Sequence, residues 1–200
     1  MILEAAYFDQ MYAGSADPWG FTSRWYEKRK YALTLALLPA ERYDHAFEPG
    51  CSIGVMTRQL ARRCDRVLSC DISAAAVTAA AARVGDQPGV RVEQRILPRE
   101  WPDGQFDLII FSEFLYYFGG PDLQQILDRA DAALLPGGTL IAVHWRHPVT
   151  EYPRGGDEVH AALGRQPALS RLAEHREPDF IAEAYLKGPL ISVAQATGLT

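Results

Sequence analysis

One acid and two glycines lie between two apolar segments, in the stretch FEPGCSIGVMTRQL at residues 47–60. Such a stretch either makes a tight turn or lets a ligand lie against bare backbone. A P-loop would need Lys and then Ser or Thr after its second glycine, whereas Val and Met follow here. A GxGxxG dinucleotide fingerprint would need glycines at positions 50, 52 and 55, and only Gly50 fits. The spacing instead meets an ExGxGxG pattern at Glu48, Gly50 and Gly54, with Ser52 as a small substitute.

A second acid, Asp71, ends an apolar segment about twenty residues after the glycines. Its carboxylate can accept hydrogen bonds from both ribose hydroxyls of an adenosyl group, as acids do in dinucleotide sites. Ser52 keeps most of the room of a glycine but adds a Cβ, which matters if φ is positive there. The loop and Asp71 together predict a site for a ligand that carries an adenosyl group.

Two further groups that could do chemistry follow later apolar segments. Glu113, preceded by Ser112, could accept a proton from an amine or hold an ammonium group; the alternative is a solvated or helix-capping carboxylate. His144 is the histidine best placed to act as a base, since its reference pKa is about 6.5. The alternative is a hydrogen-bonded histidine at a strand end. His144 and His147 do not make a metal site alone, so we expect no metal.

The remaining candidates are aromatic side chains, a cysteine and a loop. Tyr116 and Tyr117 could line a channel or stack on a sugar face, and the alternative is packing in the core. Cys51 lies beside the glycines, and we interpret it as a small buried residue rather than a nucleophile. The loop HPVTEYPRGGDE at residues 147–158 could be a lid, because long loops in compact domains are often functional.

Strands and helices alternate from residue 45 to residue 146 and must position these groups. Apolar runs predict strands at residues 45–49, 65–71, 90–96, 106–113 and 139–145, with two more at 168–175 and 179–186. Helices are expected at residues 24–38, 54–64, 72–85, 121–138 and 158–164, the third capped by Ser73. The region before residue 20 shows only scattered aromatics and a turn signal.

This alternation is typical of a parallel sheet with helices on both faces, whose ligands bind at the carboxyl ends of the strands. We therefore predict an α/β fold, a Rossmann-like three-layer sandwich with a mostly parallel seven-stranded sheet and a late antiparallel strand. The glycine loop follows the first strand, where a ligand should sit. We expect one domain at residues 1–200, with a helical cap segment at 1–40, a cofactor-binding core at 45–146, and a lid loop, helix and final strands at 147–200.

Composition excludes several other classes of protein. The 200 residues are 48% hydrophobic and 22% charged, as in one globular domain. The formal charge of −5 is unlike that of dedicated nucleic-acid binders, so we expect no nucleic-acid partner. Neither a membrane-spanning run nor a signal peptide is evident, and three cysteines without a CxxC favour a reducing cytoplasm. We expect a cytoplasmic monomer or homodimer with no membrane partner.

The motifs, taken in order, resemble those of class I S-adenosylmethionine (SAM) methyltransferases. The order runs from the glycine loop and Asp71 to FD at residues 106–107 and PGG at residues 136–138. Four longer stretches are similar to the nodulation protein S (NodS)-like branch of that family: residues 17–39, 47–73, 101–118 and 143–148. NodS is an N-methyltransferase that acts on the free amine of a deacetylated terminal sugar. The resemblance covers most of the chain.

The resemblance implies a set of site residues. The amino-terminal segment would fold over the cofactor, Trp19 covering it and Lys30 pairing with its methionine carboxylate. Arg95 stands where many relatives place an acid near the adenine amino group, so the backbone of Ile96 would recognise adenine instead. The expected cofactor-binding residues are Trp19, Tyr26, Lys30, Glu48, Gly50, Cys51, Ser52, Gly54, Asp71, Ile72, Ile96 and Ser112. The expected catalytic residues are Glu113 and His144, and the expected substrate-binding residues are Tyr116, Tyr117 and Trp145.

The implied reaction is transfer of a methyl group from SAM, with S-adenosylhomocysteine as product, to a small-molecule acceptor. The acceptor atom expected from the resemblance is an amine nitrogen such as that of an amino sugar. An O-methyltransferase of a small metabolite would use the same cofactor site, and Glu113 with His144 fits either reaction. A protein that binds SAM without catalysis is an alternative of another class. An NAD-dependent dehydrogenase is disfavoured because the glycine spacing is wrong.

Overall fold

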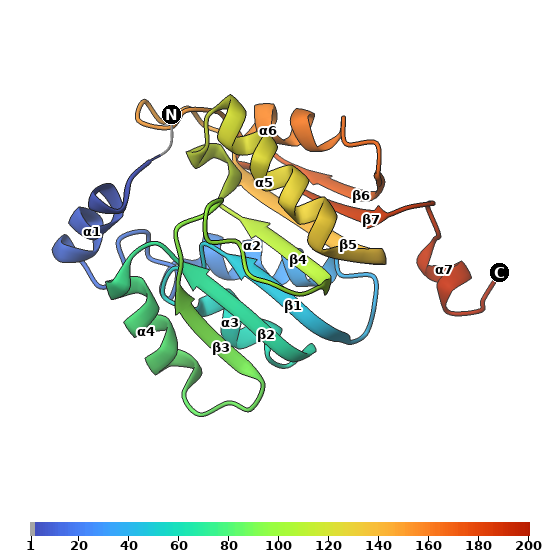
Figure 1. The fold of residues 1–200 in the computed structure, drawn as a ribbon, viewed down its shortest axis with the longest axis horizontal. Coiled ribbons are helices and arrows are strands. Elements are labelled where there is room, and N and C mark those ends of the chain that lie inside the picture. The colour runs from blue at the N-terminus through green and yellow to red at the C-terminus, as the bar shows by residue number, and fades with distance from the viewer. Residues whose placement is uncertain (1–2) are drawn as a thin grey trace.

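The computed structural model describes residues 3–200, whose elements alternate between helix and strand along most of the chain (Figure 1). The helices are α1 (Ala5–Gly14), α2 (Trp25–Ala36), α3 (Val55–Leu60), α4 (Ala74–Val84), α5 (Gly120–Ala133), α6 (Gly156–Leu163) and α7 (Val193–Ala196), with a 3₁₀ turn η1 (Leu115–Tyr117). The strands are β1 (Tyr43–Pro49), β2 (Cys64–Asp71), β3 (Val90–Gln94), β4 (Phe106–Ser112), β5 (Leu134–Trp145), β6 (Leu169–Arg176) and β7 (Phe180–Lys187).

These strands form one seven-stranded sheet in the order β3-β2-β1-β4-β5-β7-β6. The strands from β3 to β5 pair in parallel, whereas β7 runs antiparallel to both β5 and β6. The strand order reverses at β1, whose neighbours are β2 and β4, so a crevice opens at the carboxyl ends of these strands. The predicted Rossmann-like sandwich and its late antiparallel strand are confirmed.

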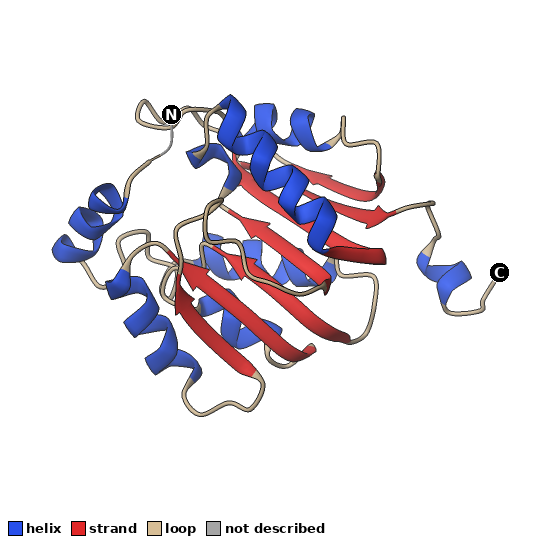
Figure 2. Ribbon diagram, viewed as in Figure 1, coloured by secondary structure: helices blue, strands red, loops and turns tan. Residues whose placement is uncertain are grey.

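Helices cover both faces of the sheet (Figure 2). On one face, α2 and α3 pack against the strands through buried residues that include Tyr31, Met56 and Leu60. On the other face, α5 and α6 contribute Ile126, Leu163 and further residues to a second core cluster. Strands buried on both faces read as continuous apolar runs, which is why β4 was predictable from FDLIIFS alone.

The structure differs from the sequence-based expectation in several elements. Helix α1 was not expected, and it lies beside the amino-terminal end of α4 (Figure 1). Helix α5 ends at Ala133, and the segment after it, expected to be helical, already belongs to β5, because Pro136 cannot continue a helix. Ser73 does occupy the N-cap position of α4, but its side chain makes no cap bond and donates instead to Asp9.

Two features are absent from the described residues, a membrane-spanning helix and a cluster of metal ligands. Between residues 3 and 200, no helix has the length and apolar character that a membrane crossing requires. Within the same range, no group of three or more His, Cys, Asp or Glu side chains is arranged to hold a metal ion.

Candidate active site

A cavity of about 660 Å³ lies at the carboxyl ends of β1, β2 and β4. Its volume is typical of small-molecule sites, which measure roughly 300–1,000 Å³. Helices α1 and α2 and the segment between them supply much of its aromatic wall, including Tyr7, Tyr12, Trp19 and Tyr26. The location agrees with the switch-point rule for open α/β sheets, so the fold itself places the ligand here.

The glycine loop forms one wall of this cavity. Gly50 adopts a φ of +73°, and a Cβ on it would lie 2.7 Å from the ring of Phe114. Gly54 has a φ of +77°, and its Cβ would lie 2.8 Å from the Cα of Ala80 in α4. Both glycines are therefore required by close packing as well as by backbone conformation. A larger side chain at either position would push the loop away from its neighbours.

Ser52 has a φ of +50°, a conformation that residues with a Cβ rarely adopt. Two hydrogen bonds hold it there: its backbone N–H donates to Asp71 Oδ2 at 2.8 Å, and its Oγ lies 2.6 Å from the hydroxyl of Tyr12. The second bond joins α1 to the glycine loop. Ser52 therefore has a strained backbone conformation, but its hydroxyl makes a hydrogen bond to Tyr12 of α1 that a glycine could not make.

Asp71 is buried at the end of β2 and lines the cavity. Its Oδ2 accepts from Ser52 N, and its Oδ1 accepts from Ser73 N at 3.0 Å. Burial raises the pKa of this carboxyl, although these backbone donors oppose the shift. The two oxygens together have about four lone-pair sites, so the backbone donors Ser52, Ser73 and Ile72 leave room for a further donor from a ligand.

Glu48 lies beneath the loop, where its Oε2 accepts from the hydroxyls of Thr57 at 2.6 Å and Ser69 at 2.7 Å. The side chain is buried, and burial raises the pKa of Glu48 to about 7 despite the two hydroxyl donors. Glu48 therefore ties β1 to α3 and β2. This contact fixes the position of the glycine loop between them.

Glu113 follows β4 directly and is the most highly connected acid in the cavity wall. Its Oε1 accepts from Lys30 Nζ at 2.6 Å, and its Oε2 accepts from the Tyr116 hydroxyl at 2.6 Å and the Trp145 N–H at 2.9 Å. Its φ of +54° turns the side chain away from the strand direction. The alternatives of a solvated or a helix-capping carboxylate do not describe this residue.

Lys30 is buried and also lies 3.0 Å from Glu27 Oε2. Burial lowers the pKa of Lys30, but the carboxylates of Glu113 and Glu27 outweigh it, so the pKa is raised. Lys30 was expected to pair with the methionine carboxylate of a cofactor. In the structure, two of its three donors already bind acids of the chain itself.

His144 does not face the cavity, contrary to its predicted role as a base. It is fully buried, its Nε2 accepts from Leu115 N at 3.1 Å, and its Nδ1 lies 3.0 Å from His160 Nε2. Burial, together with the nearby His160 and Lys30, holds its pKa well below the ordinary histidine value. With both ring nitrogens engaged, His144 cannot accept a proton from a ligand in the cavity.

Ile96 and Gly54 also do not line the cavity. The backbone N–H of Ile96 donates to the carboxylate of Glu100 at 2.7 Å, so it is not available for the adenine contact expected of it. Arg95 does line the cavity, and it also binds Glu93 through Nε and Nη2. Cys51 lies in the wall, and burial raises its pKa well above that of a free thiol, as befits an unreactive residue.

The structure brings the other sequence-predicted site residues together around one cavity. These are Trp19, Tyr26, Lys30, Glu48, Gly50, Cys51, Ser52, Asp71, Ile72, Ser112, Glu113, Tyr116, Tyr117 and Trp145. It adds residues that the sequence did not single out, notably Tyr7, Phe8 and Tyr12 of α1, Glu27 of α2, and Tyr152 of the 147–158 loop. Among these, only the aromatic content of residues 7–12 could have been a signal.

The residues of the cavity fit a ligand that carries an adenosyl group. Close-packed glycines expose backbone, and Asp71 offers two acceptor oxygens at the end of β2. The hydroxyl of Tyr26 is buried in the wall and has no hydrogen-bond partner among the described residues. A buried polar group without a partner costs about 1–3 kcal/mol, which a ligand in the cavity would remove by bonding to it.

Comparison with known proteins is consistent with this site. A family profile described as "Methyltransferase domain" matches residues 47–142. A solved structure from Pseudomonas syringae with a provisional methyltransferase assignment is 48% identical, with a TM-score of 0.74, and the match covers 82% of this chain and 100% of that one. The N-methyltransferase NodS from Bradyrhizobium japonicum WM9, solved with S-adenosylhomocysteine, has a TM-score of 0.83 at 21% identity, covering 92% of this chain and 98% of that one.

Among curated proteins, nodulation protein S of Rhizobium tropici is 28% identical over 127 residues, which are 62% of this chain and 53% of that protein. The chain thus spans about half the length of this curated relative. The residues that the family profile matches, 47–142, include the glycine loop and Asp71 at the end of β2. The chain therefore belongs to the class I SAM-dependent methyltransferases, with SAM as the cofactor of that family.

Proposed function

We propose that the protein transfers the methyl group of SAM to an amine nitrogen of a small molecule, such as that of an amino sugar. The observation that carries the proposal is the position of Glu113, a carboxylate fixed by three donors in the cavity wall at the end of β4. The NodS-like relatives support the same acceptor chemistry, since the NodS of known structure is an N-methyltransferase.

SAM supplies a methyl group already activated by its sulfonium, so the protein has mainly to align the reactants. The carboxylate of Asp71 lines the cavity and keeps acceptor capacity beyond its backbone donors, which supports a contact with the ribose hydroxyls of SAM. Oε1 of Glu113 accepts only from Lys30 among the described residues, and it keeps a lone pair that can accept a hydrogen bond from an amine.

The charges around the cavity favour a cationic or amine-bearing acceptor. Six acids line it, Glu27, Glu48, Asp71, Glu113, Glu151 and Asp179, of which Glu48 with its pKa of about 7 is only partly ionised, against three cations, Arg24, Lys30 and Arg95. Near Glu113, the rings of Tyr116 and Tyr152 stack at a centroid distance of 4.8 Å. Acidic groups next to aromatic faces bind protonated amines, and flat aromatic faces also pack against sugar rings.

The same wall argues against a hydroxyl as the acceptor. A hydroxyl must lose its proton to become a good nucleophile, whereas a neutral amine already has a free electron pair. No histidine is among the described residues that line the cavity, and His144 is engaged elsewhere. The cavity therefore lacks the most common general base, which favours nitrogen over oxygen.

The 147–158 loop is part of this proposal. Val149, Glu151 and Tyr152 from this loop line the cavity, and the ring of Tyr152 stacks on that of Tyr116, which bonds to Glu113. We propose that the loop covers the acceptor, while the segment at residues 1–40 covers the cofactor. A small-molecule acceptor in the cytoplasm fits these two covers, because a macromolecular substrate would need a more open cavity.

A matched pair of acceptors tests the proposal. A chitooligosaccharide with a deacetylated terminal sugar carries a free amine, whereas its fully acetylated counterpart has similar hydroxyls and no amine. Incubation with SAM and mass spectrometry should show a gain of one methyl group in the deacetylated compound alone. Methylation of both compounds would mean that oxygen is the acceptor. Binding of SAM without turnover on a wide panel of amines and alcohols would support a binding protein instead.

A further inference from the structure

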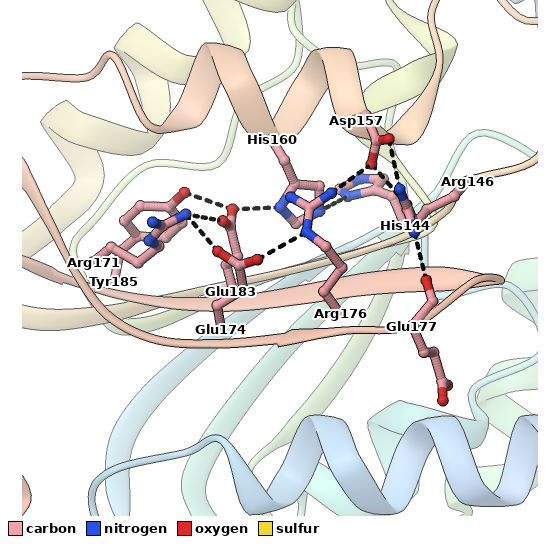
Figure 3. A network of polar contacts seen from close by, with 10 residues as sticks. All are labelled: His144, Arg146, Asp157, His160, Arg171, Glu174, Arg176, Glu177, Glu183 and Tyr185. Atoms are coloured by element: carbon pink, nitrogen blue, oxygen red, sulfur yellow. Dashed lines mark hydrogen bonds and ion pairs between the residues drawn. The ribbon is translucent and has the colours of Figure 1, made fainter.

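A chain of buried hydrogen bonds runs behind the cavity wall, through His144 of β5, His160 of α6 and Glu183 of β7 (Figure 3). The distances are 3.1 Å from Leu115 N to His144 Nε2, 3.0 Å between His144 Nδ1 and His160 Nε2, and 2.5 Å between His160 Nδ1 and Glu183 Oε2. All three side chains are almost fully buried. We call these three residues the relay.

A donor at one end of the relay, Leu115 N–H, and an acceptor at the other, the carboxylate of Glu183, fix the position of every proton. Leu115 N–H can only donate, so Nε2 of His144 carries no proton and Nδ1 must carry one. That proton points at Nε2 of His160, which must then be the acceptor, so the proton of His160 lies on its Nδ1. Nδ1–H of His160 donates to Glu183. Both histidines are therefore neutral, and both carry the proton on Nδ1.

Glu183 is a firm acceptor at the far end of the relay. Its Oε2 also accepts from the Tyr185 hydroxyl at 2.6 Å, and its Oε1 accepts from Arg171 at 2.6 Å. Burial opposes ionisation of Glu183, but the bonds from His160, Tyr185 and Arg171 outweigh it and lower its pKa to about 2. The carboxylate is thus ionised at neutral pH, and it fixes the donor-to-acceptor direction of the hydrogen bonds in the relay.

The local sequence is built to bring the two histidines together. A Cβ on Gly156, at the start of α6, would lie 2.2 Å from the backbone oxygen of Trp145, so only glycine allows α6 to approach the end of β5 this closely. On the sheet, Glu183 pairs in register with Ala142, which is two residues before His144 and therefore on the same face. Because the side chain of Ala142 is small, His160 of α6 can approach this face of the sheet and lie between His144 and Glu183.

The near end of the relay lies at the residues that face the acceptor. Leu115 begins η1, two residues after Glu113, and the ring of Tyr116 packs against His144 at a centroid distance of 5.2 Å. Glu113 has a backbone conformation that costs energy, so its surroundings must hold it in place. The bonds from Glu113 N to Val143 O and from Leu115 N to His144 provide this support.

We propose that His144 and His160 are positioning residues, which hold the segment at residues 113–117, and with it the carboxylate of Glu113, in the orientation that methyl transfer needs. The proposal rests on the proposed function for the role of Glu113. In this proposal, His144 fixes the orientation of the Leu115 N–H and takes no part in proton transfer.

The first test reads the protons directly and needs no acceptor. Nitrogen-15 NMR of the histidine-labelled protein at pH 7, with resonances assigned through His144→Gln and His160→Gln, should show unprotonated Nε2 and protonated Nδ1 for both residues. Free imidazole side chains favour the opposite tautomer, so this result is specific. A proton on Nε2 of His144, or a cationic His144, would overturn the proposal whatever the acceptor proves to be.

The second test uses two variants, His144→Gln and His144→Asn, whose amide side chains differ by one methylene group. The Gln side chain in His144→Gln places an oxygen near the position of Nε2, where it can accept from Leu115 N–H, whereas the shorter side chain in His144→Asn cannot reach it. We expect kcat of the Asn variant to be about 5- to 100-fold below that of the Gln variant, because an unmade buried bond costs about 1–3 kcal/mol. SAM affinity should be equal in both variants, and the pH profile of the Gln variant should match that of the wild type.

Two other outcomes would contradict the proposed positioning role of His144. If His144 were a general base, both variants would lose activity to the same extent and one limb of the pH profile would disappear. If His144 served only stability, the two variants would differ in unfolding midpoint and share one kcat. Should the Asn variant fail to fold, the tautomers and the pH profile of the Gln variant still decide the question.

Discussion

Glu113→Gln removes the charge that pairs with Lys30 and leaves the shape of the side chain almost unchanged. The amide oxygen can still accept from Tyr116 and the Trp145 N–H at the Oε2 position, which places the amide NH₂ against the Lys30 ammonium. The variant therefore replaces an ion pair at 2.6 Å by two facing donors. Stability and catalysis should both respond.

The size of the stability loss follows from burial. The side chains of Lys30 and Glu113 are 4% and 14% exposed, and removal of one partner of a buried ion pair typically costs about 3–5 kcal/mol. Lys30 keeps its second partner, Glu27, at 3.0 Å, so it is not left wholly unpaired. We therefore expect a fall of about 2 kcal/mol in the free energy of unfolding, measured by urea denaturation at pH 7.

Catalysis should fall by a separate route. If Glu113 accepts a hydrogen bond from the amine, loss of the charge should lower kcat/KM for an amine acceptor by about 10- to 100-fold, the equivalent of one charge-assisted hydrogen bond. SAM affinity, measured by calorimetry, should change by less than about threefold, because the contacts of Asp71 and the glycine loop are untouched. The triple variant Glu27→Gln, Lys30→Met and Glu113→Gln is the control, because it removes all three buried charges together and should regain stability without regaining activity.

Two results would refute this reasoning. An unchanged unfolding midpoint in Glu113→Gln would show that the contact with Lys30 does not stabilise the fold. Equal losses of SAM affinity and of turnover would make Glu113 a cofactor or structural residue. In the second case, the proposed acceptor site would have to lie elsewhere in the cavity.

Three further variants test other parts of the site. Asp71→Ala should weaken SAM binding by about ten- to a hundred-fold if the carboxylate binds both ribose hydroxyls, and unchanged affinity in calorimetry would defeat that assignment. Glu48 has a native pKa of about 7, above the 4.5 of an unperturbed glutamate, so the native state binds more protons than the unfolded state between these values and stability should fall as pH rises through this window. This loss of stability is on the order of 3 kcal/mol, and Glu48→Gln should reduce it. If the urea midpoint of the variant depended on pH as that of the wild type does, Glu48 would be excluded as the source of the loss. Tyr12→Phe removes only the hydroxyl that contacts Ser52, so the dissociation rate of S-adenosylhomocysteine in stopped flow should rise by about three- to tenfold with little change in melting temperature. An unchanged rate would mean that α1 does not hold the cofactor through this bond.

The strands, the glycine loop and Asp71 were predictable because each depends on a local pattern. Strand β4 is an unbroken apolar run, and the loop is recognisable from glycine spacing within a few residues. Helix α1 was not predictable, since its burial comes from a single residue, Phe8, which meets Tyr117 from a distant part of the chain. Its helical pattern therefore has too few apolar positions to be detected.

The roles of Glu113 and His144 depend on partners that are far away in sequence. Glu113 pairs with Lys30 across 83 positions, and the conformation that permits this, a positive φ at a non-glycine residue, leaves no trace in the sequence. His144 was a reasonable candidate for a base at the end of a strand. Only the packing of α6 on β5, which places His160 beside it, shows that both of its nitrogens are occupied.

The most direct measurement for this account is isothermal calorimetry of the protein with SAM, with S-adenosylhomocysteine and with NAD as the control. We expect micromolar binding of both SAM and S-adenosylhomocysteine and no binding of NAD. We also expect that Asp71→Ala weakens the binding of both SAM and S-adenosylhomocysteine. Absence of binding by SAM and S-adenosylhomocysteine would contradict the account, because the glycine loop with Ser52 and Arg95 would then not be a cofactor site, and the proposed methyl transfer would fall with it.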